Sequence, residues 1–582
     1  MKPPKAKAAT AAAAAGAPAR AAPALVFAAC FAAFLPVLSN GFVAWDDAAY
    51  LVNNPDFRGF GAANLRWMFT TVKMGNWHPL VWLTYALDYR LWGLAPRGYH
   101  LSNLLLHAAS ALLFFFIARR LLRAALPGAG GRALAAGALF AALLFGAHPL
   151  RAESVAWASE RKDVLCAFFY LLSVLCWLKA RAGEAGRWGA FSLAAFALAL
   201  MSKSMAVSLP FLLLALDYYP LRRSGGWLRA LREKATYLLL AAAASVAAMK
   251  AQRLSGAVTD LEQWGLARRV AQSAYGLFFY AAKTVWPSGL SPVYPPPTPF
   301  DPLSPAFLLA GFGVAAFSAA AWALRGRLPA LLSAWVSYVV VLLPVLGLVS
   351  IGPQFVADRY SYLACLPPVL FAGAWLAAAL DKAAAAGKGA AAPLGAALAL
   401  CLVYGGLAYR QALVWKDTES LWTRALAVDP GNYLAHNYLA LELADQGRDG
   451  EALAHYAEAL RLKPAYADAH YNLATLLPRL GRAAEAEEQY RLALGARPGF
   501  PEAHHNLAVM LEGRGLYDEA FAHYARALEL RPDYALAHYN IANAYLRRRD
   551  PASAAAHFAE ALRLRPDLAP ARAALEKLKG GR

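Results

Sequence analysis

The chain has 582 residues, of which 59% are hydrophobic and 16% are charged, with 57 Lys and Arg against 37 Asp and Glu. An ordinary soluble domain carries roughly 25% charged residues, so this composition argues against a soluble enzyme and excludes a disordered tail protein. The excess of positive charge lies in residues 1–410, which hold 36 basic and 15 acidic residues, whereas residues 411–582 hold 21 and 22. Because the basic residues punctuate apolar runs and form no continuous face, the charge indicates a membrane and no nucleic-acid partner.

Residues 25–410 contain eleven apolar stretches that reach or approach the length of about 20 residues needed to cross a membrane. These stretches lie near 22–39, 101–118, 133–149, 163–178, 188–201, 204–220, 235–250, 305–324, 328–350, 362–380 and 391–409. The fifth and sixth share one run that is broken at 201–204, where Lys203 predicts a hairpin that touches water, because a bare charge is costly in hydrocarbon. Polar residues interrupt the stretch 269–286, and we interpret it as an interfacial or re-entrant helix.

Lys and Arg in the short loops orient the spans. Residues 1–24 form a basic arm rich in Ala and Pro, expected to be disordered, and their four cations place the N-terminus in the cytoplasm. Alternation then assigns 20 of the 36 basic residues to this arm and to five short inside loops. No clean cleavage site follows the first span, so an uncleaved anchor is expected. The chain is thus predicted to be a multi-pass protein of the inner (cytoplasmic) membrane, with everything after Arg410 on the periplasmic or extracellular side.

The first polar segment on that outer side begins Trp45-Asp46-Asp47 and later includes His78. Paired carboxylates at a membrane edge can supply a general base, since mutual repulsion and partial burial raise a carboxyl pKa. The alternative is a solvated or capping acidic pair, which these two residues alone would favour.

The second outer segment, 148–163, is a dense cluster of charge between two apolar spans. On one continuous helix Glu153, Glu160 and Asp163 would not share a face, whereas Glu153 and Trp157 would. A third set consists of single cations, Lys203 and Arg359, which can hold a lipid phosphate or can snorkel and pair with a nearby carboxylate. The five cysteines lie in apolar stretches without metal-ligand spacing, so no metal site is expected from them.

Residues 411–582 carry a repeat of 34 residues. Prolines recur at 430, 464, 498, 532 and 566, and four further sets of Ala, Gly and aromatic residues keep the same step. This pattern is typical of tetratricopeptide repeats, in which two helices per unit stack into a solenoid with a concave groove. It predicts a half unit at 415–430 and full units at 431–464, 465–498, 499–532 and 533–566.

Two polar residues of the repeat recur with it. The histidines at 436, 470, 504 and 538 form either a ladder of ligands or one helix position inherited by duplication, and duplication is the preferred interpretation. The asparagines are groove candidates that could clamp a peptide backbone: Asn472, Asn506 and Asn540. The groove alone names no ligand.

The polar segments and the repeats together resemble the transmembrane-and-tetratricopeptide-repeat O-mannosyltransferase family. The resemblance rests on Trp45-Asp46-Asp47 with Tyr50 and 54–55, and on 77–80, 148–150, 153–163, 201–205 and 357–362, followed by the repeats. It covers nearly the whole chain, but Ser204 stands where the family has Pro. It implies an all-α polytopic bundle of the C-type glycosyltransferase fold, with about 11 spans, followed by the repeat solenoid.

The same resemblance implies an inverting transfer of a sugar, most simply mannose, from a polyprenyl-phosphate donor to Ser or Thr hydroxyls of proteins. Asp46 or Asp47 would be the base, with Asp46 preferred because it directly follows the Trp, and Glu153 would position the acceptor or assist. The implied substrate-binding residues are His78, His148, Arg161, Lys203 and Arg359. No cofactor is required, although some C-type enzymes use a divalent metal. Acceptor or partner proteins would bind the repeat groove.

Two other classes of function remain open. A non-catalytic membrane-anchored scaffold would use the repeats alone, but an anchor needs one span and no charged outer motifs. A transporter of lipid-linked sugars would pair intramembrane charges across inverted repeats, and residues 25–410 show no internal symmetry.

Overall fold

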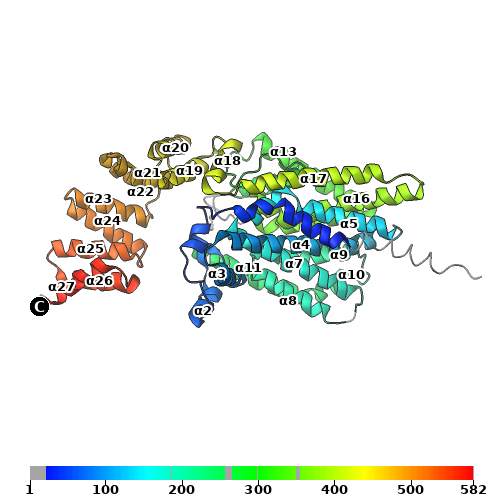
Figure 1. Ribbon diagram of the computed structural model, residues 1–582, viewed down its shortest axis with the longest axis horizontal. Helices are drawn as coiled ribbons and strands as arrows, with labels where there is room; N and C mark the ends of the chain where they lie inside the picture. The colour runs from blue at the N-terminus through cyan, green and yellow to red at the C-terminus, as the bar shows by residue number, and fades with distance from the viewer. Residues whose placement is uncertain (1–20, 185, 256–264, 298, 349–353, 581–582) are drawn as a thin grey trace, which may run out of the picture. The chain divides into compact units, whose positions relative to one another are not determined.

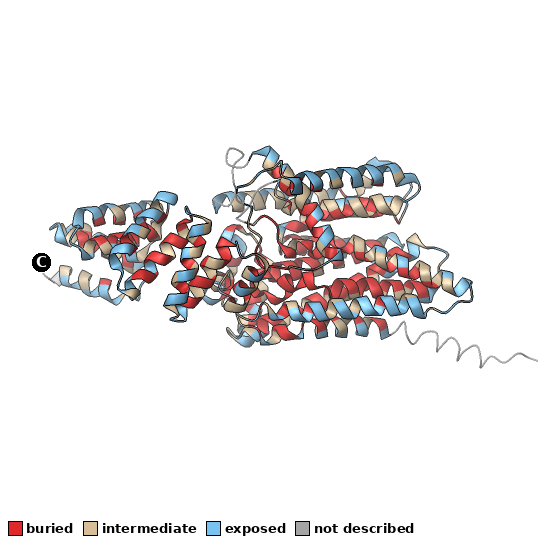
Figure 2. Ribbon diagram, turned by 90° about the horizontal axis from the view of Figure 1, so that it is seen from above, coloured by how far each residue is buried: buried red, intermediate tan, exposed pale blue. Residues whose placement is uncertain are grey.

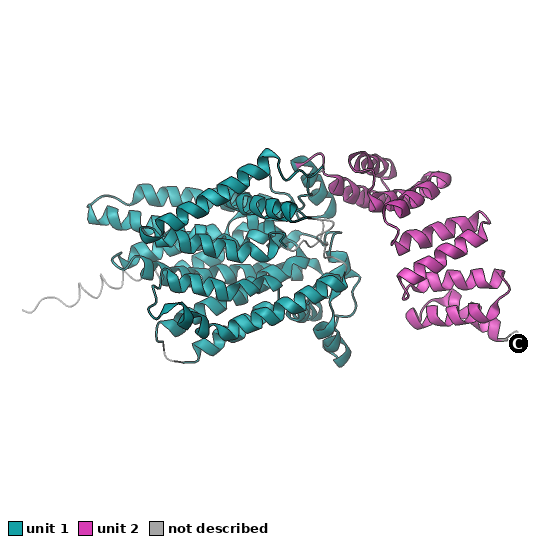
Figure 3. Ribbon diagram, turned by 180° about the vertical axis from the view of Figure 1, so that it is seen from behind, with its two compact units in different colours: residues 1–428 teal, residues 429–582 magenta. Residues whose placement is uncertain are grey.

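The computed structural model describes residues 21–184, 186–255, 265–297, 299–348 and 354–580. Within these ranges the chain is helical apart from one isolated antiparallel bridge between Tyr294 and Val356, which confirms the all-α prediction for the described residues. The chain divides into two compact units, residues 1–428 and 429–582 (Figure 3). Most of the predicted disordered arm, 1–24, lies outside the described residues.

The first unit is a bundle of long helices (Figure 1). A helix at Ala21–Ala33 precedes α2 Ala62–Thr70, α3 Pro79–Trp92, α4 Pro96–Ala125, α5 Gly131–Gly146, α6 Ala152–Ala156, α7 Arg161–Arg181, α8 Trp188–Leu200, α9 Leu209–Tyr218, α10 Gly226–Glu233, α11 Ala235–Leu254, α12 Leu266–Val285, α13 Pro305–Ala323, α14 Pro329–Leu342, α15 Ser361–Ala364, α16 Leu366–Ala385, α17 Ala391–Leu413 and α18 Thr418–Val428. Short turns of 3-10 or π helix lie between them: η1 Leu35–Ser39, η2 Ala48–Val52, η3 Lys73–Gly75, η4 Pro149–Arg151, η5 Ala158–Glu160, η6 Ser204–Ser208, η7 Leu324–Gly326, η8 Leu343–Val345 and η9 Asp358–Tyr360.

Each of the eleven predicted apolar stretches contains a helix, but the helices differ in length. Among the described residues six are long and apolar enough to cross a membrane, and a seventh is obtained if α5 and the bent segment Pro149–Ala156 count as one span. The other four, Ala21–Ala33, Trp188–Leu200, Ser204–Tyr218 and Pro329–Val345, have 10–17 residues. The structure thus supports six or seven spans, and the count of eleven stays a prediction.

The bundle packs through close helix crossings. Helix α5 lies against α4 and α16, and α7 lies against α4 and α8. At the crossing of α5 and α16, a Cβ on Gly137 would lie 2.3 Å from the carbonyl oxygen of Gly373, so neither glycine can be replaced without moving the helices apart. By contrast α13 and α17 expose large apolar side chains, for example Phe312 at 74% and Leu402 at 67%. Exposed apolar faces of this kind are stable in lipid and unstable in water.

Helix α12 covers the stretch that the sequence excludes from the spans, and it is not among the six long apolar helices. The polar residues of α12 hold this helix against neighbouring backbone. Gln272 donates to the carbonyl of Phe355 at 2.9 Å, and Ser273 donates to the carbonyl of Leu346 at 3.0 Å. Polar residues inside this apolar stretch therefore mark contacts with the loop before α15.

The second unit consists of paired helices, which end in one additional helix. The pairs are α19 Tyr433–Asp445 with α20 Asp449–Leu462, α21 Ala467–Leu476 and η10 Leu477–Leu480 with α22 Ala483–Ala496, α23 Pro501–Gly513 with α24 Tyr517–Leu530, and α25 Ala535–Arg547 with α26 Pro551–Leu564, followed by α27 Ala569–Gly580. Figure 2 shows buried residues on the facing sides of these helices. Helix α27 packs on α26 and was not predicted.

The repeat positions have the roles that the period predicts. The alanines at 440, 474, 508 and 542 are fully buried where the helices cross, and Tyr456 and its counterparts are buried beside them. Gly447 adopts φ +78° after α19, a left-handed conformation that favours glycine and ends the helix. Gly481 and Gly515 do the same in the next two units.

Candidate active site

The two aspartates after Trp45 have different surroundings. Asp47 is buried, and its carboxylate accepts hydrogen bonds from the backbone N–H of Val43 at 3.0 Å, the backbone N–H of Ser159 at 2.9 Å and the Ser159 hydroxyl. Burial raises the pKa of Asp47 to about 6, and these donors oppose the rise. Asp47 therefore ties the first loop to the charged segment 148–163.

Asp46 is only half-buried, and the described part of the chain shows no hydrogen bond to its carboxylate. Burial raises the pKa of Asp46 above its ordinary value, while the positive charges of Lys162 and Arg359 oppose the rise and Glu160 adds to it. Asp46 thus presents an open carboxylate beside a group of buried charges.

The segment 148–163 is not one helix. Its elements are η4, α6 and η5, and α7 begins only at Arg161. Trp157 lies between α6 and η5 in an extended conformation, with φ −88° and ψ 117°, and it turns the chain. This break brings Glu153, Glu160 and Asp163 into one cluster through shared cations, and the expectation for one continuous helix does not apply because the segment is not one helix.

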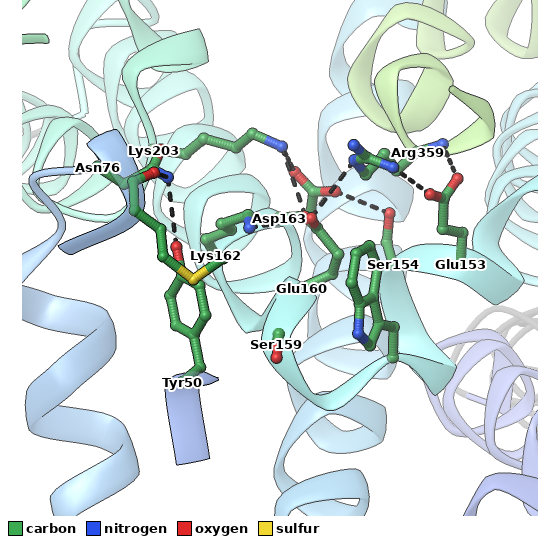
Figure 4. Close-up of polar contacts among 12 residues, drawn as sticks. Tyr50, Asn76, Glu153, Ser154, Ser159, Glu160, Lys162, Asp163, Lys203 and Arg359 are labelled. Carbon is green, nitrogen blue, oxygen red and sulfur yellow. Dashed lines mark hydrogen bonds and ion pairs between the residues drawn. The ribbon is translucent and has the colours of Figure 1, made fainter. Parts of the chain in front are cut away.

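Three cations hold this cluster together (Figure 4). Arg359 pairs with Glu153 through its guanidinium and donates its backbone N–H to the same carboxylate at 2.8 Å, and its Nε lies 3.4 Å from Glu160. Lys203 pairs with Asp163, and its Nζ lies 3.6 Å from Glu160. Figure 4 shows Lys203 and Arg359 approaching Glu160 and Asp163 from opposite sides.

Lys162 is the third cation. Its Nζ lies 3.0 Å from Glu160 and 5.3 Å from the centre of the Tyr50 ring. Three carboxylates and three cations thus form one network, in which Glu160 contacts all three cations, and Lys203 and Arg359 each contact two carboxylates. The cluster forms a charged wall near Asp46, whose pKa responds to Lys162, Glu160 and Arg359.

Lys203 reaches the cluster because the chain breaks there. Helix α8 ends at Leu200, and Lys203 adopts φ −156° and ψ 137° before η6 begins. The broken hairpin predicted at 201–204 is therefore present, even with Ser204 in the place of the family's Pro.

A cavity of about 350 Å³ lies beside the cluster. Its polar lining includes Lys162, Lys203 and His78, and its apolar lining comes from α11, η6 and η8, among them Met249, Val207 and Leu343. His78 is buried, and its Nε2 has no hydrogen-bond partner among the described residues. Burial lowers the pKa of His78 to about 3, so its ring is neutral near pH 7. The cavity joins cations and a neutral hydrogen-bonding ring to an apolar wall.

Of the five predicted substrate-binding residues, His78 and Lys203 line this cavity, whereas Arg359, Arg161 and His148 do not. Arg161 is buried and forms an ion pair with Asp88 at 2.6 Å, while its Nη2 donates to the carbonyl of Tyr99 at 2.9 Å. His148 is buried with its Nε2 3.0 Å from the carbonyl of Thr284, and its Nδ1 accepts from the N–H of Leu150. Both side chains join helices in the structure and do not line the cavity.

Four tryptophans cover the other side of the first loop. Trp45 stacks on Trp157 with ring centroids 4.6 Å apart and contacts Trp422 at 5.1 Å, and Trp157 also stacks on Trp415 at 5.4 Å. The N–H of Ala44 donates to the Thr418 hydroxyl at 2.9 Å. Helix α18, the predicted half unit, therefore packs within the first unit and holds the loop that carries Asp46.

The groove asparagines of the repeats are engaged in contacts of the array itself. Asn472 donates to Asn437 at 3.0 Å, and Asn506 donates to the hydroxyls of Tyr471 and Tyr490 at 3.1 and 3.3 Å. The hydroxyl of Tyr524 accepts from Asn540. A peptide would have to compete with these contacts.

The repeating histidines pair within each repeat. In three units the Nδ1 atoms of two histidines lie 2.8 to 2.9 Å apart, namely His436 with His455, His504 with His523, and His538 with His557. In the remaining unit His470 faces Gln489 at 2.6 Å. Within the described ranges, no three His, Cys, Asp or Glu side chains are placed to hold one metal ion. Each pair joins the two helices of its unit, which agrees with a position inherited by duplication.

Glu160, Lys162 and Asp163 were given no role in the predicted site, although they lie in the charged segment 148–163. The contribution of α11 to the cavity was not predicted either. The density of charge was the available signal for the first group. The second could not be read from the sequence, because a lipid-facing and a cavity-facing apolar residue look alike.

Comparison with known proteins supports the repeats directly. Family models described as tetratricopeptide or TPR repeats match residues 440–481, 467–500 and 500–567. Solved structures with similar folds include MamA, at 20% identity and a TM-score of 0.24 over 26% of this chain and 90% of that one. Another is YrrB, described as a TPR protein with an unusual peptide-binding site, at 24% identity and a TM-score of 0.24 over 27% and 82%. The three family models confirm the predicted tetratricopeptide repeats.

Curated relatives carry the name protein O-mannosyl-transferase. Tmtc1 of Drosophila melanogaster is 38% identical over 156 residues, 25% of this chain and 17% of that protein. Human TMTC4 is 33% identical over 153 residues, 24% and 21%, and mouse TMTC2 is 39% identical over 119 residues, 20% and 13%. The chain spans about a fifth of the length of these relatives, and the similarity lies in the repeats. The chain is thus similar to this family in its repeat part, and the predicted resemblance over the membrane part stays a prediction.

Proposed function

We propose that this chain is a membrane glycosyltransferase that moves a sugar, mannose by resemblance, from a polyprenyl-phosphate donor to Ser or Thr hydroxyls of proteins on the non-cytoplasmic side. The observation that carries the proposal is the position of Lys162, whose charge acts on the open carboxylate of Asp46 and whose side chain also lines the cavity with Lys203. The proposed base is thus linked through the charge of Lys162 to a cavity lined by two cations, while Asp46 itself is not one of the residues that line it.

The donor fits the cavity by its chemistry. A polyprenyl-phosphate sugar carries an anionic phosphate between a polar sugar and an apolar chain. Lys162 and Lys203 would hold the phosphate by charge-assisted hydrogen bonds, His78 would donate to or accept from the sugar, and Met249, Val207 and Leu343 would contact the chain. Both cations already balance carboxylates, so the phosphate would enter a site whose positive charge is held in place before binding.

Asp46 would act as the general base. It takes the proton of the acceptor hydroxyl while the hydroxyl oxygen forms a bond to the anomeric carbon. The bond between that carbon and the phosphate oxygen breaks, and the polyprenyl phosphate leaves with the electron pair, which Lys162 and Lys203 stabilise. Attack opposite the departing phosphate inverts the anomeric carbon. Proton transfer of this kind contributes about 10²–10⁴-fold to a rate.

Glu153 and Arg359 would not contact the substrate, and would instead hold other residues of the site in place. The carboxylate of Glu153 is occupied by the guanidinium and backbone N–H of Arg359, and Arg359 also contacts Glu160. Neither side chain has a free group directed at the cavity. The pair fixes α6 to η9, and thereby holds the wall that faces Asp46.

The repeats would present the acceptor protein or a partner of it. Tetratricopeptide arrays bind extended or helical segments of other proteins along their concave side. The relatives named protein O-mannosyl-transferases are similar to this chain in that part, which is the reason for assigning protein acceptors and not free sugars or lipids.

The test is transfer by the purified full-length protein in vesicles that contain polyprenyl-phosphate mannose, with mass spectrometry of a panel of Ser- and Thr-rich acceptor proteins. We expect wild-type transfer, a loss of at least about 100-fold in Asp46→Asn, and near-normal transfer in the control Asp56→Asn, whose exposed carboxylate lies in the same loop. Transfer by Asp46→Asn at the wild-type rate would refute the base. No transfer by the wild type from any polyprenyl-phosphate sugar tested would favour the non-catalytic scaffold.

A further inference from the structure

A second charged cavity lies at the opposite ends of α4 and α7 from the candidate active site. The beginnings of the two helices meet where Arg161 contacts Tyr99, and their last turns line a cavity of about 630 Å³. The arginines that line it are Arg119, Arg120, Arg123, Arg181 and Arg223. Glu184 is the one acidic residue of that lining.

The acidic residues nearby neutralise only part of this charge. Arg120 pairs with Glu184 at 2.6 Å, and Arg181 and Arg223 both pair with Glu233, Arg181 at 3.2 Å. Arg119 and Arg123 are exposed and form no ion pair within the described residues. They lie one turn apart on α4, so both guanidinium groups are on the same face of the helix.

The walls between these arginines are apolar. Phe116 and Leu178 belong to α4 and α7, two of the long apolar helices, and Leu221 follows α9. A further, almost wholly apolar cavity of about 380 Å³ is lined by neighbouring faces of α4 and α7 and by Tyr219 and Pro220. Cationic and apolar surfaces therefore lie side by side at this end of the bundle.

Helix α10, which begins three residues after Arg223, has the features of a helix that lies on a membrane surface. It exposes Trp227 at 64% and Leu228 at 71%, while Arg229 and Arg232 lie elsewhere on its surface. Short helices with a Trp and Leu face and a basic face lie in the headgroup region of a bilayer. This places the arginine cavity at the depth of lipid phosphates.

We propose that the arginine cavity binds the phosphate headgroup of an anionic membrane lipid, held by Arg119 and Arg123, with the chains of that lipid along the apolar faces of α4 and α7. Guanidinium groups bind phosphate oxygens in pairs and attract anionic lipids at a membrane surface. A free phosphate compound would satisfy the arginines but would leave the apolar walls and α10 without a role. The proposal does not depend on the transfer reaction.

The test is lipid binding by the full-length protein in mixed micelles, followed by native mass spectrometry with phosphatidylglycerol or phosphatidylcholine. We expect the wild type to prefer phosphatidylglycerol and Arg119→Gln/Arg123→Gln to bind it about tenfold more weakly, with an unchanged melting temperature. The matched control is Arg325→Gln/Arg327→Gln, which removes two exposed charges at the same end of the bundle, where the Tyr218 hydroxyl reaches the carbonyl of Arg325. This control should keep the wild-type preference.

Three results would overturn the proposal. The wild type could bind both lipids equally, the double variant could bind phosphatidylglycerol as tightly as the wild type, or the control could lose as much affinity as the double variant. A fourth arm uses inorganic phosphate without lipid. If phosphate displaces phosphatidylglycerol at similar concentration, the site serves a soluble phosphate and the lipid assignment fails.

Discussion

Asp47 takes its hydrogen bonds from Val43 and Ser159, and this leaves Asp46 as the open carboxylate of the first loop. The two aspartates therefore differ in environment because Val43 and Ser159 donate hydrogen bonds to Asp47 and not to Asp46. One acid fixes the loop, and the other faces the charged wall of Glu160 and Lys162. A base must be ionised to accept a proton, so the raised pKa of Asp46 has a measurable consequence.

We expect kcat/KM for transfer to fall with unit slope on acidification, at a pH above the ordinary Asp value of about 3.9, because protonated Asp46 cannot accept the acceptor proton. Asp47, with a pKa of about 6, titrates in the same range. Ser159→Ala separates the two, since loss of the Ser159 hydroxyl raises the pKa of Asp47 further and has no contact with Asp46. If Ser159→Ala shifts the pH at which kcat/KM falls, the group that must be ionised is Asp47, and the role of Asp46 as the base is contradicted.

From the sequence, Asp46 could be preferred over Asp47 as the base only because it directly follows Trp45. The physical reason, a serine that is 112 positions away and donates twice to Asp47, is a tertiary contact that no local pattern contains. Likewise the family resemblance implies that Arg161 and His148 bind substrate, and in the structure they contact Asp88 and the carbonyl of Thr284. Type and spacing identified the charged segment, but not which of its members face the cavity.

At the scale of elements, two breaks create the site. Trp157 interrupts the helix between α6 and η5, and Lys203 separates α8 from η6. Charged residues at a break can turn toward one another instead of facing lipid, which explains why Lys203 reaches Asp163. The break at Lys203 was predictable from a charge inside an apolar run. The break at Trp157 was not, because Ala, Glu and Ser on either side of it all favour or tolerate a helix.

Lys203→Gln should raise KM for the polyprenyl-phosphate donor by about tenfold, which corresponds to one lost charge-assisted hydrogen bond of about 1.4 kcal/mol. Lys203→Arg should restore most of the affinity because it keeps the charge. The control is Lys416→Gln, because Lys416 is exposed and its backbone carbonyl accepts a hydrogen bond from Gly41 at the start of the first loop. Initial rates at varied donor concentration give KM and kcat separately. A change confined to kcat would show that Lys203 does not contact the donor.

The histidine pairs give the repeats a defined response to pH. Burial lowers the pKa of His455, His523 and His557 below 6.5, and the facing histidine lowers the pKa of each further. The unfolded chain therefore binds more protons than the folded array just below pH 6.5, and the free energy of unfolding should decrease as the pH falls through this range. Above it, the contribution is constant.

Thermal melts of residues 429–582 between neutral and mildly acidic pH measure this decrease. Replacing the three histidines by Gln copies the natural His470–Gln489 unit and should remove much of the pH dependence. The remainder comes from His504, whose pKa is lowered by burial, and from His505, whose pKa burial lowers to about 4. An unchanged slope in the triple variant would show that the pairs do not control the stability of the array.

For the whole molecule, the order of the membrane part and the repeats could be predicted from the sequence, but the number of membrane-spanning helices could not. Every predicted stretch is helical, but Trp188–Leu200 and Ser204–Tyr218 are short because the break at Lys203 divides one apolar run between them. Hydropathy cannot decide whether two such helices cross the bilayer separately or as one hairpin. The repeats themselves, by contrast, were predictable because several positions keep one period, although the additional helix α27 was not predicted.

The predicted orientation can be tested with single cysteines in a Cys401→Ser background, since the other four native cysteines are buried. An impermeant thiol reagent on intact cells should label Asn53→Cys in the first loop and Gly450→Cys in the repeats, both at exposed positions. Gly128→Cys, in an exposed loop after α4, should be labelled only after the membrane is permeabilised. Protection of the first two positions in intact cells would reverse the orientation and remove the basis for a lipid-linked donor.

The packing of α18 against the first loop also decides where this protein can be cut. Composition changes near Arg410, and an excision that begins there would remove Trp415 and Trp422, whose buried rings contact Trp157 and Trp45. Loss of one buried Trp costs about 3–5 kcal/mol, so such a fragment should aggregate or lose its outer loops. A fragment that ends at Pro430 keeps both rings and the whole first unit, so the proposed role of Asp46 can be tested in it without the solenoid.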